Sequence, residues 1–214
     1  MAYSSGMSYF KILGSGNETM INVTDYEAIL VDLDGTLVDT SGVNYMAYEA
    51  AVSLYGYHID YVYFKNYCNG RHYLEFLPQL TTDDKKILEA IHQVKKELYK
   101  NYLNEARVNV QLVDILRTAR ESVDNTGKRK CKTGLVTTAS RKNTIELLAQ
   151  YELLSLFDVI ITQEDVIHKK PNPEGYIKAM DLLKIDAERV LVFEDSDAGI
   201  EAARRSGIRY IEEV

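Results

Sequence analysis

Runs of consecutive hydrophobic residues recur along the chain, and the clearest covers residues 28–33, Ala-Ile-Leu-Val-Asp-Leu. A run that is apolar at successive positions is typical of a strand buried on both faces of a parallel sheet. Three similar runs and a shorter fifth one follow it: residues 133–137, 157–162, 189–193 and 208–211. The pattern therefore predicts the strands of a mostly parallel sheet.

Helical patterns lie between the later runs. Ser140 is placed to cap one helix, Asn172-Pro173 is a typical helix start, and Ser196 or Asp197 begins a third helix. Strands that alternate with helices from residue 132 to 211 predict a doubly wound, Rossmann-like α/β fold with right-handed crossovers.

The stretch between the first two predicted strands breaks this rhythm, because about one hundred residues is far more than a crossover requires. Apolar residues recur there at helical spacing: Val43, Ala47, Ala51 and Leu54, then Ile87, Ile91, Val94, Leu98 and Tyr102. We therefore expect an α-helical cap domain at residues 42–104, inserted into an α/β core of residues 25–41 and 105–214. Residues 1–24 lack clear periodicity and predict an irregular or weakly ordered leader.

Composition narrows the class of protein. The chain has 25 Lys and Arg against 32 Asp and Glu, a net charge of −7, which disfavours nucleic-acid binding. No apolar stretch is long enough for a membrane helix, and the first ten residues lack the features of a secretory signal. Two cysteines, Cys68 and Cys131, are expected to be free thiols of a protein in a reducing compartment. A cytoplasmic protein is the expectation, with the choice between monomer and dimer left open.

The most informative segment follows the first predicted strand, where Asp32 and Asp34 lie two residues apart before Gly35. If the backbone turns at the glycine, both carboxylates border one pocket at the carboxyl end of the sheet, where α/β folds place ligands. Two neighbouring buried negative charges are costly unless a metal ion or a substrate group compensates them. The structural alternative is that these carboxylates only cap a helix and accept backbone N–H groups.

Asp32-Leu33-Asp34-Gly35-Thr36 resembles the first motif of the haloacid dehalogenase superfamily. The resemblance continues in the correct order through three more motifs. Thr137 follows the apolar Leu135-Val136, Lys170 precedes Pro-Asn-Pro, and Glu194-Asp195-Ser196 precedes a helix of small residues. Together the four motifs span residues 25–211.

The resemblance implies a chemistry for the acidic residues. Asp32 would be the nucleophile that forms an aspartyl-phosphate, and Asp34 would be the general acid and then the general base. A Mg²⁺ ion would be held by the Asp32 carboxylate, the Asp34 backbone carbonyl and Asp195, with Glu194 helping directly or through water. Asp34 favours transfer of a phosphoryl group over displacement of a halide.

The resemblance also implies how a phosphate group would be bound. The Thr137 hydroxyl would donate to a phosphate oxygen, assisted by backbone N–H groups near Thr138 and Ala139. Lys170 would supply a positive charge to the phosphoryl oxygens and hold Asp32 in place. Taken alone, Thr137 could simply end a strand, and Lys170 could be a solvated lysine beside Lys169.

The helical insertion resembles the smaller cap of this superfamily, which closes over small phosphate esters such as sugar phosphates and phosphoglycolate. Substrate contacts are then expected from cap residues: Asn44, Tyr45, Asn69, Gly70 and Arg71. β-Phosphoglucomutases generally carry a histidine near position 44 and a different cap signature from residues 68–71, so the sequence favours a phosphatase. A phosphosugar mutase and a catalytically silent binding protein with this fold are the alternatives.

Overall fold

The computed structural model describes residues 9–13, 18–208 and 210–214. Its central sheet has the strand order β7-β6-β3-β8-β9, and every neighbouring pair is parallel. The strands are β3 (Ala28–Val31), β6 (Lys132–Val136), β7 (Val159–Ile161), β8 (Val190–Glu194) and β9 (Tyr210–Glu213). The predicted fold class is confirmed, and the first of the apolar runs forms the middle strand.

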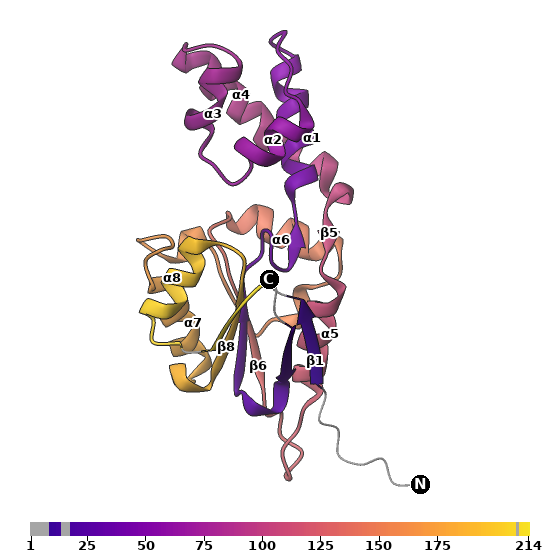
Figure 1. Ribbon diagram of the computed structural model, residues 1–214, viewed down its shortest axis with the longest axis vertical. Helices are drawn as coiled ribbons and strands as arrows, with labels where there is room; N and C mark the ends of the chain where they lie inside the picture. The colour runs from indigo at the N-terminus through magenta and orange to yellow at the C-terminus, as the bar shows by residue number, and fades with distance from the viewer. Residues whose placement is uncertain (1–8, 14–17, 209) are drawn as a thin grey trace. The chain divides into compact units, whose positions relative to one another are not determined.

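Helices cover the sheet on its two faces (Figure 1). They are α5 (Val110–Glu121), α6 (Arg141–Gln150), α7 (Glu174–Leu183) and α8 (Asp197–Arg205). Helix α7 contacts β6 and β7, and α8 contacts β8 and β9. On this face Leu30, Val136 and Val192 of the sheet pack in one core with Tyr176 and Met180 of α7. The apolar face of α7 thus fixes this helix over the strands.

The chain before the sheet differs from its prediction. Strands β1 (Tyr9–Leu13) and β2 (Glu18–Asn22) pair antiparallel, and the 3-10 helix η1 (Val23–Asp25) follows them. The expectation of an irregular leader is therefore wrong for these residues, while residues 1–8 and 14–17 lie outside the described part. Two runs with aromatic and β-branched residues flank Gly-Ser-Gly-Asn, which is typical of a β-hairpin. Such a hairpin has neither the helical spacing nor the continuous apolar run that indicated the other elements.

The chain divides into two compact units, one of which is Asp39–Arg107 and the other the remainder. The helical unit contains α1 (Ser41–Ser53), α2 (Tyr61–Tyr67), α3 (Tyr73–Leu80), α4 (Lys85–Leu98) and the 3-10 helix η2 (Tyr99–Glu105). Its own core gathers aromatic and aliphatic side chains, including Tyr48, Phe64, Phe76, Leu77 and Ile91. The chain enters and leaves this unit through two short paired strands, β4 (Val38–Asp39) and β5 (Arg107–Val108).

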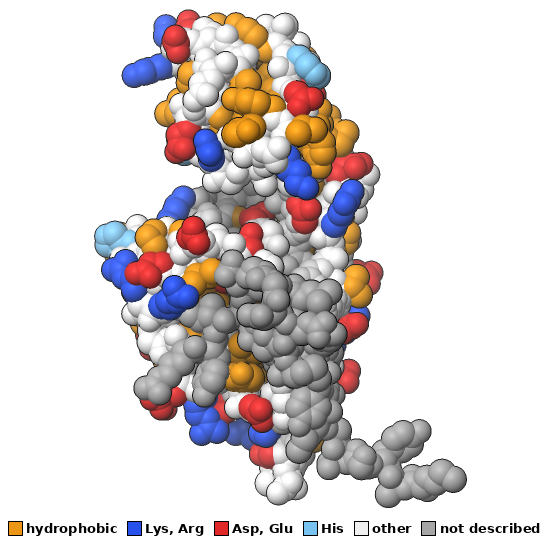
Figure 2. Space-filling view, in the orientation of Figure 1, with side chains coloured by type: hydrophobic (Ala, Val, Ile, Leu, Met, Phe, Trp, Pro, Cys, Tyr) orange, Lys and Arg blue, Asp and Glu red, His pale blue; other side chains and the backbone are white. Residues whose placement is uncertain are grey.

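The burial of side chains bears on the predictions about membrane helices and about the two cysteines. Hydrophobic side chains are also exposed on the helical unit, among them Met46, Val62 and Tyr67 (Figure 2). None of the helices in the described part of the chain combines the length and the hydrophobicity needed to cross a bilayer. Cys68 and Cys131 are both buried and unpaired, as expected. Burial raises the pKa of both thiols, that of Cys131 to about 12, so they stay protonated and unreactive at neutral pH.

Candidate active site

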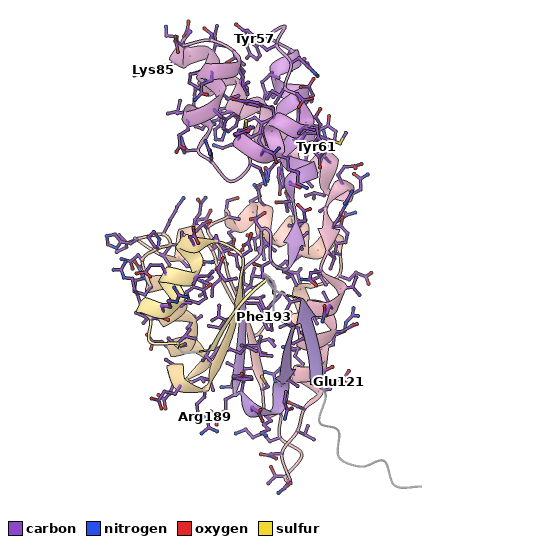
Figure 3. The ribbon with its side chains drawn as sticks, in the orientation of Figure 1. Tyr57, Tyr61, Lys85, Glu121, Arg189 and Phe193 are labelled. Carbon is purple, nitrogen blue, oxygen red and sulfur yellow. The ribbon has the colours of Figure 1, made fainter. Side chains whose placement is uncertain are left out.

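The carboxyl ends of the central strands meet at one edge of the sheet. Strand β8 runs from the neighbourhood of Arg189 toward Phe193, as the labels of Figure 3 show. The backbone N–H of Asp32 donates to the carbonyl oxygen of Phe193 at 3.0 Å. This hydrogen bond continues the pairing of β3 with β8, so Asp32 and Glu194 leave adjacent strands at the same level of the sheet.

The turn after β3 depends on Gly35. Its φ of +94° is in the left-handed region that glycine adopts without strain. A Cβ at this position would also collide with the carboxylate of Asp195. Glycine therefore allows the chain to turn and the Asp195 side chain to lie against the turn, which brings the first and fourth motifs into contact.

Three carboxylates gather at this edge. Asp32, Glu194 and Asp195 each offer an oxygen, and these oxygens lie within 4.8 Å of one another. Asp32 is 7% exposed and Glu194 is fully buried, whereas Asp195 is exposed. Closely spaced oxygen donors of this kind suit a hard divalent cation such as Mg²⁺. The residues present thus fit the metal site that the sequence predicts.

Lys170 is the cation of the cluster. Its Nζ lies 2.6 Å from Oδ1 of Asp32 and 2.6 Å from Oε2 of Glu194. The lysine lies in the loop that precedes α7, and its peptide bond to Pro171 is cis. A fully surface-exposed, solvated Lys170 is excluded, because only 8% of its side chain is exposed. The structure thus brings together four of the predicted residues from three separate segments of the chain.

Burial and charge act in opposite directions on these groups. The pKa of Asp32 is raised to about 8, mainly because the group is buried. The Lys170 ammonium lowers this pKa, whereas the charges of Glu194 and Asp34 raise it further. For Lys170, burial alone would lower the pKa, but the carboxylates of Asp32 and Glu194 raise it above its ordinary value. Burial also raises the pKa of Asp195. When no metal ion is bound, burial therefore favours the protonated forms of Asp32 and Asp195.

Thr137 follows β6 at the carboxyl edge of the sheet and is buried, with an exposed fraction of 5%. Its Oγ1 accepts a hydrogen bond of 3.1 Å from the N–H of Ala139, so this N–H is already used within the chain. Thr137, Thr138 and Lys170 line a small pocket together with apolar side chains such as Val136, Ile161 and Tyr176. Lys170 belongs both to this pocket and to the acidic cluster.

Asp34 is exposed, directly after the buried Asp32 and Leu33. Its backbone forms an isolated bridge with Val38, which closes the turn around Gly35. Its charge contributes to the raised pKa of Asp32. Asp34 is thus more accessible than Asp32, and their roles as proton-transfer group and nucleophile stay a prediction.

Three contacts of the cluster escaped the sequence analysis. The Thr36 hydroxyl donates to Oδ1 of Asp195 at 3.1 Å, and the Tyr176 hydroxyl donates to Oε2 of Glu194 at 2.6 Å. Ser196 caps α8 as expected, since its Oγ accepts from the N–H of Gly199, but it also donates to Oε1 of Glu194 at 2.9 Å. Tyr176 lies among the apolar residues of α7, and the sequence analysis did not assign it to the site, although a buried tyrosine hydroxyl needs a polar partner.

The residues predicted for substrate contacts in the cap all lie in the helical unit. Asn44 of α1 accepts from Nζ of Lys95 of α4 at 2.7 Å. Gly70 has a φ of +78° in the turn between α2 and α3, and the exposed Arg71 follows it. The next residue, His72, is exposed and is the N-cap of α3. Contact of Asn44, Gly70 and Arg71 with a substrate stays a prediction.

The chain is similar to known proteins over most of its length. Residues 29–212 match the family described as haloacid dehalogenase-like hydrolase. A phosphorylated carbohydrates phosphatase from Thermotoga maritima is 30% identical over 86% of this chain and 83% of its own. Pyrophosphatase PpaX from Bacillus cereus is 31% identical over 85% of this chain and 80% of its own.

The chain is also similar to a solved structure. CbbY from Rhodobacter sphaeroides, in complex with phosphate, is 25% identical and superposes with a TM-score of 0.69 over 88% of this chain and 87% of its own. The segment that matches the family, residues 29–212, includes Asp32, Lys170, Glu194 and Asp195. With its parallel sheet, acidic cluster and buried lysine, the chain belongs to the haloacid dehalogenase-like hydrolases.

Proposed function

We propose that this protein is a Mg²⁺-dependent phosphatase that hydrolyses a small phosphate monoester through a phosphorylated Asp32. The observation that carries the proposal is the position of Lys170, whose Nζ lies 2.6 Å from both Asp32 and Glu194 at the edge where Asp195 completes the acidic cluster. A buried carboxylate held by a cation, next to further carboxylates that suit a divalent metal ion, is the arrangement that phosphoryl transfer needs.

The first half of the reaction uses Asp32 and Asp34. A carboxylate oxygen of Asp32 attacks phosphorus and forms a new O–P bond, while the bond from phosphorus to the ester oxygen breaks. Asp34 donates its proton to that oxygen, and the alcohol leaves. Lys170 keeps the Asp32 carboxylate oriented and offers positive charge to the oxygens of the phosphoryl group.

The second half releases phosphate. Asp34, now deprotonated, takes a proton from a water molecule as the water oxygen bonds to phosphorus. The bond between phosphorus and Asp32 then breaks, which restores the carboxylate and gives inorganic phosphate. Thr137 and Thr138 are placed at the pocket beside Lys170, where a hydroxyl and a backbone N–H can hold phosphate oxygens through both steps.

Asp32, the backbone carbonyl of Asp34 and Asp195 would hold the Mg²⁺ ion, with Glu194 contributing directly or through water. When bound, such an ion neutralises part of the charge on the carboxylates and on the transferred phosphoryl group. The support for this assignment is the acidic cluster, in which oxygens of Asp32, Glu194 and Asp195 lie within 4.8 Å of one another. Burial raises the pKa of Asp32 and Asp195, so a divalent cation would favour their ionised forms.

We assign substrate selection to the helical unit as a cap domain, with Asn44, Gly70 and Arg71 as candidate contacts. A cap that closes would exclude water from the site. The substrate class is a small phosphorylated metabolite, such as a sugar phosphate or phosphoglycolate. The phosphatase from Thermotoga maritima supports phosphorylated carbohydrates, and PpaX supports pyrophosphate as a further candidate.

The test is a phosphate-release screen with sugar phosphates, phosphoglycolate, nucleotides and pyrophosphate. Wild type, Asp32→Asn and the surface control Asp181→Asn are compared with and without a chelator of divalent metals. We expect release by wild type and by Asp181→Asn in Mg²⁺, and none by Asp32→Asn or after chelation. Release that survives Asp32→Asn or chelation would refute the mechanism.

A phosphosugar mutase is the second candidate, because Glu194-Asp195-Ser196 resembles the fourth motif of β-phosphoglucomutases. It would interconvert hexose phosphates in the presence of a bisphosphate primer and liberate little phosphate. Product analysis of hexose phosphates incubated with and without the primer separates the two activities.

A further inference from the structure

The carboxylate of Glu194 is surrounded by hydrogen-bond donors of the chain itself. Its Oε2 accepts from Nζ of Lys170 and from the hydroxyl of Tyr176, both at 2.6 Å. Its Oε1 accepts from Oγ of Ser196 at 2.9 Å and from the N–H of Ser196 at 3.4 Å. Both oxygens of the carboxylate therefore accept hydrogen bonds from neighbouring groups of the chain.

The backbone of α8 restricts this side chain further. A Cβ on Gly199 would collide with the carboxyl group of Glu194, so the helix lies directly against it. Glu194 is fully buried, and its orientation is set by Ser196 on one oxygen and by Tyr176 and Lys170 on the other. Asp195 differs, because it is exposed and its Oδ1 accepts one hydroxyl, that of Thr36.

Tyr176 is the least expected member of this set. It lies on α7, is 1% exposed, and holds the ammonium of Lys170 5.1 Å from the centre of its ring. Its hydroxyl is a neutral donor, so it satisfies Oε2 without adding a second positive charge. The charge of Lys170 is therefore still shared with Asp32.

From this geometry, and on the basis of the proposed function, we infer that Tyr176 is a positioning residue that, with Ser196, turns Glu194 toward Lys170 and keeps it out of direct contact with a bound cation. Asp32 and Asp195 then provide the direct carboxylate ligands. Glu194 acts from outside the coordination shell by fixing Lys170, whose ammonium in turn orients Asp32. Partners of this kind around a metal site influence affinity and activity although they do not touch the ion.

The experiment uses Mn²⁺ as a paramagnetic probe on the full chain, without substrate. The variants are Tyr176→Phe, Glu194→Gln, the double variant and Asp195→Asn. Tyr48→Phe is the matched control, because it removes another buried tyrosine hydroxyl, which contacts His92 in the helical unit. Dissociation constants come from titration, and the number of water molecules on bound Mn²⁺ comes from electron paramagnetic resonance in ¹⁷O-enriched water.

We expect Tyr176→Phe to weaken Mn²⁺ binding about tenfold and Glu194→Gln about 10- to 100-fold, the range for partners outside the coordination shell. The double variant should bind no more weakly than Glu194→Gln, because Tyr176 acts through Glu194. The number of bound waters should be the same in these three variants and in wild type. In Tyr176→Phe this is because Lys170 and Ser196 still hold Glu194 away from the cation, although less firmly. Asp195→Asn should bind at least about 100-fold more weakly, as a direct ligand is lost.

One additional bound water in Glu194→Gln would overturn the inference, because it would mark the loss of a direct ligand. A Tyr176→Phe variant that binds like Tyr48→Phe would also overturn it. Failure of the proposed function has a different signature, namely phosphate release that persists in Asp32→Asn. Absence of Mn²⁺ binding to the wild-type chain would reject both proposals.

Discussion

Nζ of Lys170 lies 2.6 Å from Oδ1 of Asp32, although 138 residues separate them in the chain. The same ammonium reaches Glu194 at 2.6 Å, so one buried cation is shared by two buried carboxylates. The exposed fractions of the three side chains are 8%, 10% and 1%, which leaves little solvent to compensate any of these charges. Each charge therefore depends on the others for its stability.

Replacement of Lys170 by methionine should leave Asp32 and Glu194 without a cation. We expect the free energy of unfolding at pH 8 to fall by about 3–5 kcal/mol, the cost of breaking a buried ion pair from one side. At pH 5 the loss should be smaller, because the carboxylates of the variant can take up protons. Urea unfolding at both pH values measures the difference.

Lys169→Met is the control, since that lysine contacts Gln163 on the exposed surface and should change the free energy of unfolding by less than about 0.5 kcal/mol. Equal effects of the two substitutions would contradict the buried role of Lys170.

Binding of Mg²⁺ should release a proton near neutral pH. Because the pKa of Asp32 is raised to about 8 in the metal-free protein, the cation must displace a proton from this group below that pH. The affinity for Mg²⁺ should rise with pH by up to about tenfold per unit and level off above pH 8. Calorimetric titration in two buffers of different ionisation enthalpy detects the proton. Asp32→Asn should bind more weakly and show no such slope; a wild-type affinity that is flat between pH 6 and 8 would be the opposite result.

Gly199→Ala should destabilise the protein, although alanine in a helix is ordinarily better than glycine by about 0.5–1 kcal/mol. The added Cβ would collide with the carboxyl group of Glu194, which has no free space into which to move. We expect a loss of about 1–3 kcal/mol in the free energy of unfolding, measured without metal. Glu201→Ala, at an exposed position of the same helix, should stay within about 0.5 kcal/mol. A gain in stability from Gly199→Ala would show that α8 does not press on Glu194.

Asp158 should support the α/β unit at neutral pH but not in acid. It accepts hydrogen bonds from Arg129 at 2.7 Å, from Arg120 at 3.2 Å and from the N–H of Thr133 at 2.9 Å. Burial alone would raise the pKa of Asp158, but these donors hold it below its ordinary value. Its stabilising effect is therefore present above about pH 4 and disappears as the pH falls through the lowered value.

We expect Asp158→Asn to lower the free energy of unfolding by about 1–2 kcal/mol at pH 7, with the difference from wild type shrinking below pH 4. Asp114→Asn is the matched control, because Asp114 forms an exposed ion pair of 3.7 Å with Arg117 and should show a negligible change. A deficit of Asp158→Asn that is constant from pH 7 to pH 3 would contradict the ionised role of this group.

The apolar pattern of the chain was sufficient to predict the sheet and its helices, because burial on both faces of a strand or on one face of a helix shows directly in the order of residues. The apolar pattern did not identify the polar residues of the site, most of which came from the resemblance of the four motifs to those of the haloacid dehalogenase superfamily. Asp32, Thr137 and Glu194 follow three different parallel strands, and the carboxyl ends of such strands meet at one edge. The antiparallel pair β1 and β2 was missed, since its signal is local alternation around a turn rather than a long apolar run.

Other features depended on the tertiary structure. Tyr176 has the same place in the apolar stripe of α7 as its aliphatic neighbours, and only the packing of α7 on the sheet shows that its hydroxyl faces Glu194. Gly199 likewise looks like an ordinary helical glycine until α8 is placed against that carboxylate. A hydrophobic pattern tells which side chains are buried, whereas the pairing of buried polar atoms depends on strand order and helix position. For this protein the sequence by itself predicted the central sheet, the helices around it and the candidate site residues, and the tertiary structure decided which groups hold those residues in place.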